Sequence, residues 1–352
     1  MGEDFAGLAD GRVAVTGTKS VIWPNEMADV TGRFDDCEMQ YDRIARPLCS
    51  GLVRPLSSID LELPYDLMAQ AAVSPHRYQD GSFAGAGGLP LYYQAWLPAD
   101  RQHRAVLINL HGLGDHSGLY PTIASHFPPR GIAVYAYDMR GNGRSPGQRA
   151  YLNAWREYRD DLHAFVSQVR TWDTGVPIFV LGHSLGGLVV LEYALQSPGG
   201  LAGVIAAAPS VGKVGVPPLL MALGRVMSRI WPRFSLEVGM DLSGLARDPA
   251  VVAKVLSDPL FHRRGTARLS TEVTAAITRV QAQAVNFSVP LLILHGSDDR
   301  MVPPEGSREF FRKVRYPDRE FREYPGAYHG LFADIGYQEV LRDLECWIEA
   351  RL

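Results

Sequence analysis

Two serines of this 352-residue chain lie in a Gly-x-Ser-x-Gly pattern, and either one could supply a nucleophilic hydroxyl. One pattern is GHSLG around Ser184, and the other is GRSPG around Ser145. Because the chain holds 35 glycines, such a pattern also arises by chance, and its context has to decide. A nucleophile of this type stands on a tight turn between a strand and a helix, where the next backbone N–H stabilises negative charge on the substrate.

The residue that follows each serine separates the two candidates. Ser145 is followed by Pro146, which has no backbone N–H, and it lies in the polar loop MRGNGRSPGQR. We therefore predict a structural role for Ser145. Ser184 follows the apolar run 178–181, and Leu185 after it offers an N–H at the start of an apolar stretch that can form a helix. Ser184 is the predicted nucleophile.

A serine hydroxyl needs a base that takes its proton, and the base needs a carboxylate that orients it. When the nucleophile follows a strand of a parallel sheet, the acid and then the histidine come later in the chain. The histidines after Ser184 are His262, His295 and His329. His329 lies in the loop YPGAYHGLF after the last expected strand and is the predicted base, whereas His295 ends an apolar run and fits a core or supporting position.

The acid and a second oxyanion donor have candidates in two further loops. The stretch LLILHGSDDRMVPP offers Asp298 and Asp299 after an apolar run, and periodicity does not decide which of them faces His329. The loop HGLGDHSG, residues 111–118, follows the apolar run 105–110 and can supply backbone amides to the oxyanion. An amide loop, a serine turn, an acid turn and a histidine loop in this order indicate a serine hydrolase.

These loops need a sheet that brings them to one edge, and the pattern from residue 76 onward predicts one. Short apolar runs alternate with amphipathic stretches, which is typical of a mostly parallel sheet covered by helices. The expected strands are 91–96, 105–110, 133–137, 178–181, 203–207, 291–294 and 320–324. The expected helices are 153–169, 185–196, 306–314 and 338–348.

Two regions depart from this alternation. Residues 1–75 are rich in Gly, Pro, Asp and Ser, and we interpret them as an N-terminal accessory arm, with dimerisation or gating of an acyl channel as hypotheses for its role. The interval 211–287 contains several helical patterns and reads as a lid rather than a structureless loop. Its first pattern, within 219–231, has an apolar face that fits either packing on the core or contact with a membrane.

Composition and charge exclude several classes of partner. The net charge of −3 argues against nucleic acid. No run approaches the roughly 20 apolar residues of a membrane span, and MGEDFAGLAD does not resemble a signal peptide. Three cysteines fit a reducing compartment, which predicts a cytoplasmic protein.

His111, Asp115 and His116 match no metal-ligand spacing, so neither a metal nor an organic cofactor is predicted. Arg140, Arg144 and Arg149 are interpreted as solvated loop residues rather than an anion site.

The motifs together resemble those of the monoacylglycerol lipase and lysophospholipase-like branch of the α/β-hydrolase superfamily. The resemblance covers residue 76 to the C-terminus and leaves out the N-terminal arm. The stretches that carry it are HGLGDHSGLY at 111–120, YDMRGNGRSPGQR at 137–149, GHSLGG at 182–187, SDPL at 257–260, HGSDDRMV at 295–302 and GAYHGL at 326–331.

The resemblance implies a role for individual residues. It makes Ser184 the nucleophile and His329 the base, and it selects Asp299 rather than Asp298 as the acid. Leu113 and Leu185 match the residues whose amides form the oxyanion hole. The implied architecture is an α/β-hydrolase core, 76–210 and 288–352, with a helical cap, 211–287, whose apolar helix can touch membranes or micelles.

The leading hypothesis is a serine hydrolase that cleaves carboxylic esters of lipid-like substrates through an acyl-enzyme. A short-chain carboxylesterase with the same triad is the nearest alternative. A non-catalytic scaffold that binds a ligand or a protein is the alternative of another class, and the intact set of candidate residues speaks against it. Acyl-chain length, the alcohol portion and the oligomeric state are left open by the sequence.

Overall fold

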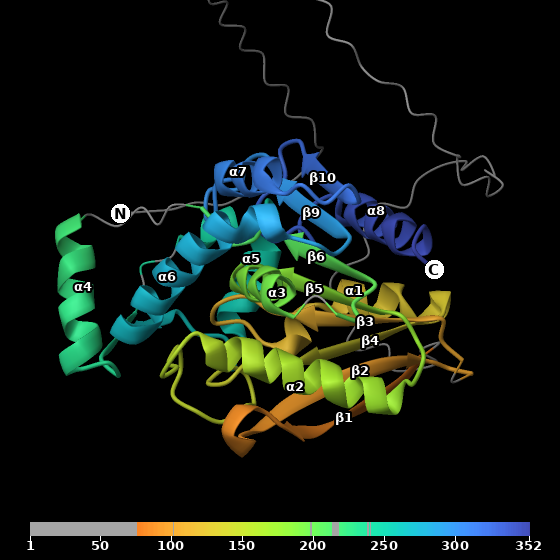
Figure 1. The fold of residues 1–352 in the computed structure, drawn as a ribbon, viewed down its shortest axis with the longest axis horizontal. Helices are drawn as coiled ribbons and strands as arrows, with labels where there is room; N and C mark the ends of the chain where they lie inside the picture. Colours follow the sequence, from red (N-terminus) through yellow and green to blue (C-terminus); the bar gives the residue numbers. More distant parts are fainter. Residues whose placement is uncertain (1–75, 101, 198, 213–217, 238, 240) are drawn as a thin grey trace, which may run out of the picture. The chain divides into compact units, whose positions relative to one another are not determined.

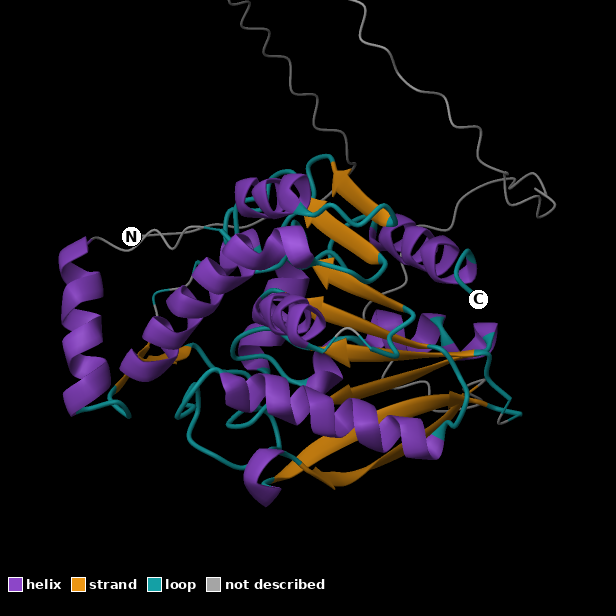
Figure 2. Ribbon diagram, in the orientation of Figure 1, coloured by secondary structure: helices purple, strands orange, loops and turns teal. Residues whose placement is uncertain are grey.

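The structure is a computed structural model that describes residues 76–352, apart from 101, 198, 213–217, 238 and 240. The predicted accessory arm, 1–75, lies outside the described residues. The described part is built on a central sheet with helices on both of its faces, as Figure 1 and Figure 2 show. This is the architecture that the alternation of apolar runs and amphipathic stretches predicts.

The sheet has eight strands in the order β1-β2-β4-β3-β5-β6-β9-β10. Strands β1, β2 and β4 pair antiparallel, and all other pairs are parallel. The bounds are β1 His76–Ala84, β2 Pro90–Pro98, β3 Ala105–Leu110, β4 Ile132–Tyr137, β5 Ile178–His183, β6 Gly203–Ala207, β9 Leu291–Gly296 and β10 Arg319–Tyr324. Every strand expected from the sequence is present, with its ends within two residues of the prediction.

Strand β1 was not expected, and its surroundings explain why. It forms a hairpin with β2 at one edge of the sheet, and most of its side chains are exposed or half-buried. Its sequence, HRYQDGSFA, therefore contains no apolar run, because an edge strand with one wet face does not need one. The inner strands β3 to β6 and β9 are buried at every position.

Two hydrophobic cores, one on each face of the sheet, hold the helices in place. Alternate residues of a strand belong to opposite cores: Val106, Ile108 and Leu110 of β3 to one, Ala105 and Leu107 to the other. The helices on the first side are α2 (Arg156–Trp172), α3 (Leu185–Gln196), α6 (Ala267–Gln283) and α7 (Glu305–Lys313). On the second side are α1 (Pro121–His126) and α8 (Tyr337–Glu349). Helix α3 agrees with its prediction at both ends.

Helix α2 begins later than predicted, at Arg156 rather than at Asn153. The amide N–H and the side-chain amide of Asn153 each donate a 2.9 Å hydrogen bond to the carboxylate of Glu157. Asn153 therefore satisfies its donors through a side chain rather than as part of the helix. This is the usual behaviour of a short polar side chain ahead of a helix.

The interval 211–287 connects β6 to β9 and forms mostly helices. Its elements are α4 (Pro218–Ile230), β7 (Ser235–Glu237), the 3-10 helix η4 (Leu242–Gly244), α5 (Pro249–Ser257), β8 (Arg264–Thr266), α6 and the 3-10 helix η5 (Ala284–Asn286). Helix α4 packs on α6, while α6 packs on α3. On α4, Leu223, Val226 and Ile230 are 55%, 53% and 73% exposed, so at these positions the helix does not pack on the core.

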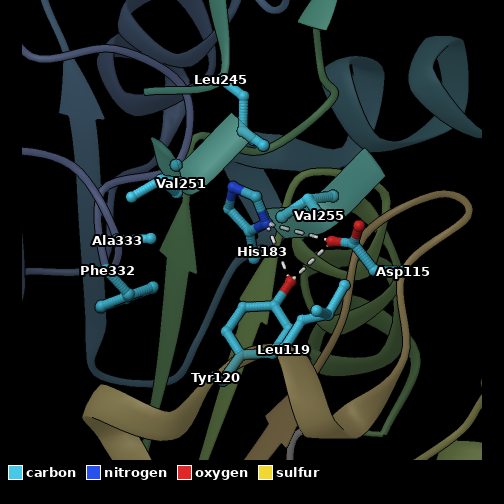
Figure 3. A pocket seen from close by; sticks show the side chains of 10 residues that line it. Asp115, Leu119, Tyr120, His183, Leu245, Val251, Val255, Phe332 and Ala333 are labelled. Atoms are coloured by element: carbon cyan, nitrogen blue, oxygen red, sulfur yellow. Dashed lines mark hydrogen bonds and ion pairs between the residues drawn. The ribbon is translucent and has the colours of Figure 1, made fainter. Parts of the chain in front are cut away.

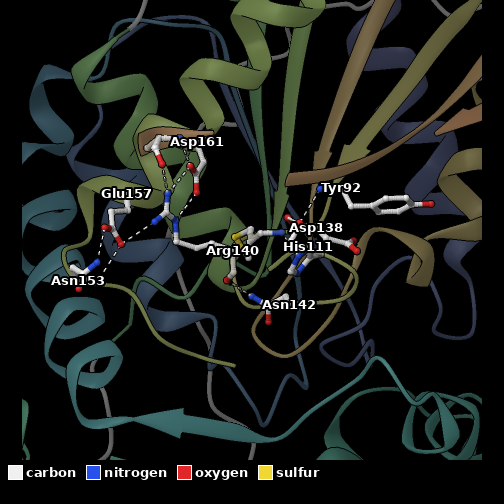
Figure 4. Close-up of polar contacts among 11 residues, drawn as sticks. Tyr92, His111, Asp138, Arg140, Asn142, Asn153, Glu157 and Asp161 are labelled. Carbon is white, nitrogen blue, oxygen red and sulfur yellow. Dashed lines mark hydrogen bonds and ion pairs between the residues drawn. The ribbon is translucent and has the colours of Figure 1, made fainter. Parts of the chain in front are cut away.

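A buried ion pair joins the loop after β4 to α2 and corrects the interpretation of Arg140 as a solvated residue. The guanidinium of Arg140 donates two 2.7 Å hydrogen bonds to Asp161, whose side chain is fully buried, and lies 3.0 Å from Glu157 (Figure 4). The same Asp161 accepts a 2.8 Å hydrogen bond from the amide of Ala86, in the turn between β1 and β2. Removal of one partner of such a pair leaves an uncompensated buried charge, which typically costs about 3–5 kcal/mol.

The structural role predicted for Ser145 is confirmed by its contacts. Its hydroxyl donates a 2.6 Å hydrogen bond to the carbonyl of Asp138 and accepts a 2.9 Å hydrogen bond from the amide of Tyr92. It thereby ties the loop after β4 to strand β2. A hydroxyl that is occupied in this way is a structural group.

Candidate active site

The backbone at Ser184 is strained, and the strain presents the side chain at the end of β5. Ser184 has φ 55° and ψ −116°, a conformation that residues with a side chain rarely adopt. Its amide donates to the carbonyl of Ala207 at 2.9 Å, and its own carbonyl accepts from Ser210 at 3.0 Å and from Leu188 at 3.2 Å. The Oγ atom of Ser184 lies 3.4 Å from that of Ser210, a long hydrogen bond. A strand-to-helix turn therefore carries this serine, as its motif predicts.

The glycines of the motif are required by close backbone approaches. A Cβ atom on Gly186 would lie 2.4 Å from the carbonyl oxygen of Leu110 and 2.5 Å from that of His111. A Cβ atom on Gly182 would lie 2.2 Å from the carbonyl oxygen of Gly186. Helix α3 can therefore start against both β5 and the loop after β3 only because these positions lack side chains.

An imidazole and a carboxylate are paired directly beyond the ends of β9 and β10. The Nδ1 atom of His329 lies 2.7 Å from Oδ2 of Asp299, and both side chains are buried. Asp298 instead accepts a 2.7 Å hydrogen bond from the hydroxyl of Ser297. Of the two adjacent aspartates, the structure thus places Asp299 against the histidine.

The carboxylate of Asp299 is held in its ionised form. Burial alone would raise its pKa, but hydrogen bonds from His295 and His329 and from the amide of Val302 keep the pKa of Asp299 well below its usual range. His295 lies 3.2 Å from Asp299 through Nε2, which also donates to the carbonyl of Val302 at 2.8 Å. His295 thus occupies the supporting position that the sequence suggests.

The loop that carries His329 is fixed by the 211–287 interval. The amide of His329 donates to the carbonyl of Gly244 at 3.1 Å, and the amide of Gly330 donates to that of Leu245 at 2.7 Å. Buried Asp334 accepts hydrogen bonds from the amide of Tyr328 at 2.9 Å and from Nε of Arg247 at 3.0 Å. Neither Asp334 nor this anchoring was identified from the sequence, because no local pattern indicates it.

The loop after β3 lies against the serine turn. A Cβ atom on Gly112 would come within 3.2 Å of Cβ of Ser184, so the two segments are in contact. Strands β3 and β5 are neighbours, and the strand order reverses its direction between them. Open sheets bind ligands beyond the carboxyl ends of the strands at such a switch point. Leu185 is the first residue of α3, so its N–H has no acceptor within the helix. Leu113 follows Gly112 in the loop, where the sequence predicts the second oxyanion amide.

Two histidines, His116 and His262, link the 211–287 interval to the loops after β3 and β4. His116 lies 3.0 Å from Asp258 through Nε2, and His262 lies 2.9 Å from the side-chain oxygen of Asn142. The amide of His262 also donates to the carbonyl of Gly114 at 3.0 Å. Burial lowers the pKa of His262 to about 4, with the charge of Arg149 acting in the same direction. His262 is therefore a neutral contact residue.

A buried network behind the turn was missed from the sequence, although its members lie in the quoted motifs. His183, the residue before the serine, contacts the hydroxyl of Tyr120 at 3.0 Å and the carbonyl of His329 at 3.1 Å. Tyr120 also donates to Asp115 at 3.0 Å (Figure 3). The network borders a cavity of about 40 Å³ whose lining includes Leu245, Val251 and Val255. A buried polar residue next to a nucleophile is the signal that could have identified His183.

Comparisons with known proteins show what the chain as a whole is similar to. The family described as "Serine aminopeptidase, S33" matches residues 101–336. A monoacylglycerol lipase of Mycolicibacterium smegmatis is 34% identical over 273 residues, 77% of this chain and 97% of the relative. The human monoglyceride lipase is 28% identical over 280 residues, 78% of this chain and 92% of the relative. The crystal structure of the Paleococcus ferrophilus monoacylglycerol lipase matches with a TM-score of 0.69 and 33% identity, covering 74% of this chain and 99% of that one.

Fold, site and relatives define the class: this is a carboxylic ester hydrolase with the α/β-hydrolase fold. The chain belongs to the serine aminopeptidase S33 family. Within the described ranges, no helix is both long enough and apolar enough to cross a bilayer.

The close approach at Gly186 gives a direct test of the turn. Replacement by alanine, Gly186→Ala, sets a methyl group against two backbone oxygens, which cannot move independently of β3. We expect the free energy of unfolding to fall by about 1–3 kcal/mol and ester hydrolysis to be lost. Urea denaturation followed by tryptophan fluorescence measures the first effect. The matched control is Gly199→Ala, where a Cβ atom meets nothing within 4 Å and stability should not change; equal stability of both variants would contradict the argument.

Proposed function

We propose that the chain hydrolyses monoacylglycerols and related lipid esters, with Ser184 as nucleophile, His329 as base and Asp299 as acid. The observation that carries this proposal is the 2.7 Å bond between His329 and Asp299 beyond the strand ends where strained Ser184 stands. The relatives named as monoacylglycerol lipases support the substrate class. Those names describe the relatives, and the substrate of this chain is our inference.

In the acylation half of the reaction, Ser184 turns from Ser210 towards His329. Nδ1 of His329 is engaged by Asp299, so Nε2 is the atom that takes the hydroxyl proton. The serine oxygen then bonds to the carbonyl carbon of the ester. The tetrahedral intermediate collapses when the bond to the alcohol oxygen breaks, and that oxygen receives the proton from Nε2.

In the deacylation half, water replaces the alcohol. His329 takes a proton from water as the water oxygen attacks the acyl carbon, and the bond to Ser184 breaks. The serine oxygen recovers its proton from His329, and the fatty acid leaves. The amides of Leu113 and Leu185 donate to the oxyanion in both halves, and one such donor is typically worth roughly 10²–10³ in rate. Every step uses groups of this chain and water, with no cofactor.

We assign residues 76–210 and 288–352 to the catalytic core and 211–287 to a cap, whose helix α6 also packs against the first hydrophobic core of the sheet. The anchoring of His329 by η4 and the contact of His262 with Gly114 support this division, because they bring the interval to both sides of the site. Residues of α5 line the cavity beside His183, so the interval also contributes side chains next to the catalytic turn.

The assignment of the nucleophile is tested with Ser184→Ala. We expect the variant to lose labelling by a fluorophosphonate probe and to lose ester hydrolysis, while its unfolding transition stays that of the parent chain. A second variant, Asp299→Asn, should retain the fold and lose about 10⁴-fold in kcat, because it stabilises the wrong tautomer of His329. The probe readout decides between an enzyme and a non-catalytic scaffold. Retained labelling of Ser184→Ala would mean that another residue is the nucleophile.

The substrate class is tested with a series of esters from acetyl to long acyl chains, with monoacylglycerols included. We expect kcat/KM to rise with chain length to a maximum at medium or long chains, because the cap adds apolar surface that can bury methylene groups, each worth about 0.8 kcal/mol. A maximum at acetyl or butyryl esters would instead identify a short-chain carboxylesterase with the same catalytic residues.

We further propose that the cap touches lipid surfaces transiently through α4 and the residue after it. Leu223, Val226, Ile230 and Trp231 are all more than half exposed, and this much apolar surface on one short segment is unusual for a side of a protein that faces water only. Helix α4 also contains two arginines and no acidic residue, a composition that suits a helix lying at a lipid interface. A cytoplasmic location stays a prediction.

Vesicle binding tests this surface. The variants Leu223→Asp and Ile230→Asp should each weaken co-sedimentation with phosphatidylcholine and phosphatidylglycerol vesicles by about tenfold or more, because a buried aliphatic side chain contributes about 1.5–3 kcal/mol. Hydrolysis of a soluble short ester should not change. The control is Leu352→Asp at the C-terminus, a residue that is 46% exposed and lies outside the cap. If the control weakened binding as much as the cap variants, the surface would not be specific.

A further inference from the structure

We propose that His183 is a positioning residue that joins the base loop and the oxyanion loop across the nucleophile turn. It stands at the end of β5, directly before Ser184, and is 4% exposed. The inference rests on the proposed function, because it concerns how His329 and the amide loop are held for the reaction. Sequence patterns assign no role to this residue.

The hydrogen bonds of His183 define its tautomer. Nε2 faces the carbonyl oxygen of His329 at 3.1 Å, and a carbonyl oxygen can only accept. Nε2 therefore carries the hydrogen. In a neutral imidazole Nδ1 is then an acceptor, and it lies 3.0 Å from the hydroxyl of Tyr120, whose single hydrogen is shared between Nδ1 and the carboxylate of Asp115. Both ring nitrogens are thus satisfied inside the protein, and Figure 3 shows the contact between His183 and Tyr120.

His183 is neutral, which suits its place beside the base. Burial, together with the nearby His329, lowers the pKa of His183 to about 4. The two imidazole rings lie with their centroids 4.7 Å apart at an interplanar angle of 45°. His329 becomes positively charged in each half of the reaction, and a second cation at this distance would oppose that charge. A neutral ring can hold the loop without this electrostatic cost.

Tyr120 extends the same connection to the oxyanion loop. Its hydroxyl oxygen accepts a 3.2 Å hydrogen bond from the amide of Gly112, one residue before Leu113. Asp115, 3.0 Å from the same hydroxyl, is a second acceptor for its proton. One chain of hydrogen bonds therefore runs from the oxyanion loop through Tyr120 and His183 to the backbone of the base. This chain of hydrogen bonds sets the distance between the oxyanion loop and His329, which must act on the same substrate carbonyl.

The network contacts the reacting groups through the backbone, so its loss should change kcat rather than KM. We expect His183→Leu to lower kcat about tenfold or more with KM within twofold of the parent enzyme, because two buried hydrogen bonds are lost. His183→Gln keeps a donor towards His329 and an acceptor towards Tyr120, and it should recover most of the rate. Tyr120→Phe should lower kcat roughly fivefold or more, because the hydroxyl that contacts Gly112, Asp115 and His183 is lost.

A double-mutant cycle separates positioning from general damage. Because His183 and Tyr120 act in one chain, Tyr120→Phe should lower kcat less than twofold in the His183→Leu background. The control is His163→Leu, which disrupts a different histidine–tyrosine pair, His163 with Tyr193 on α2 and α3, and should leave kcat unchanged. Unfolding transitions are measured for all variants, and Tyr120→Phe and His183→Gln carry the test if His183→Leu does not fold.

Three outcomes would overturn the proposal: an unchanged kcat in a folded His183→Leu, no recovery with His183→Gln, or effects of the two single variants that multiply in the double variant. Each is distinct from a failure of the proposed function, which is read from labelling of Ser184→Ala in the same assay. If Ser184→Ala loses labelling while His183→Leu keeps the parent rate, the nucleophile stands and the positioning role falls.

Discussion

The left-handed backbone at Ser184 is the constraint on which the rest of the site depends. A non-glycine residue in such a conformation costs of the order of 1–3 kcal/mol, and it persists only where its surroundings leave no alternative. Here the surroundings are the hydrogen bonds to Ala207 and Ser210 and the close approach of α3 at Gly186. As a result, the side chain of Ser184 lies at the end of β5, next to the amide of Leu185 at the start of α3. The buried parallel strands give this turn a rigid base.

The side chains near His329 include one charged group, Asp299, and one neutral ring, His183. Asp299 is an ionised carboxylate in a buried position and receives hydrogen bonds from two histidines and two amides. His183, which burial keeps neutral, lies beside His329 with the two ring centroids 4.7 Å apart. The positive charge that His329 gains in each half of the proposed reaction is therefore attracted by Asp299 and is not repelled by the uncharged ring of His183.

The sequence was sufficient for the fold class, the parallel strands and the residues that meet at the strand ends, because each depends on a local pattern. Gly182 and Gly186 mark a turn that only small residues permit, and the inner strands are continuous apolar runs. Contacts between distant segments have no such pattern. The burial of Arg140 depends on Asp161, which lies on another element. The exposure of Leu223 depends on which face of α4 packs against the rest of the protein. The choice between Asp298 and Asp299 needed the family resemblance, since neighbouring positions share one periodicity.

The anchoring of the base loop by η4 has a consequence for modularity. Caps are the parts of such enzymes that one would exchange to change substrate range, and the ends of the 211–287 interval look like natural junctions. Yet the carbonyls of Gly244 and Leu245 that hold His329 and Gly330 come from within that interval. A chimera cut at its ends would inherit a base loop from one parent and its anchor from the other. A smaller unit, α4 and the chain that follows it up to the start of η4, can be exchanged without touching this anchor.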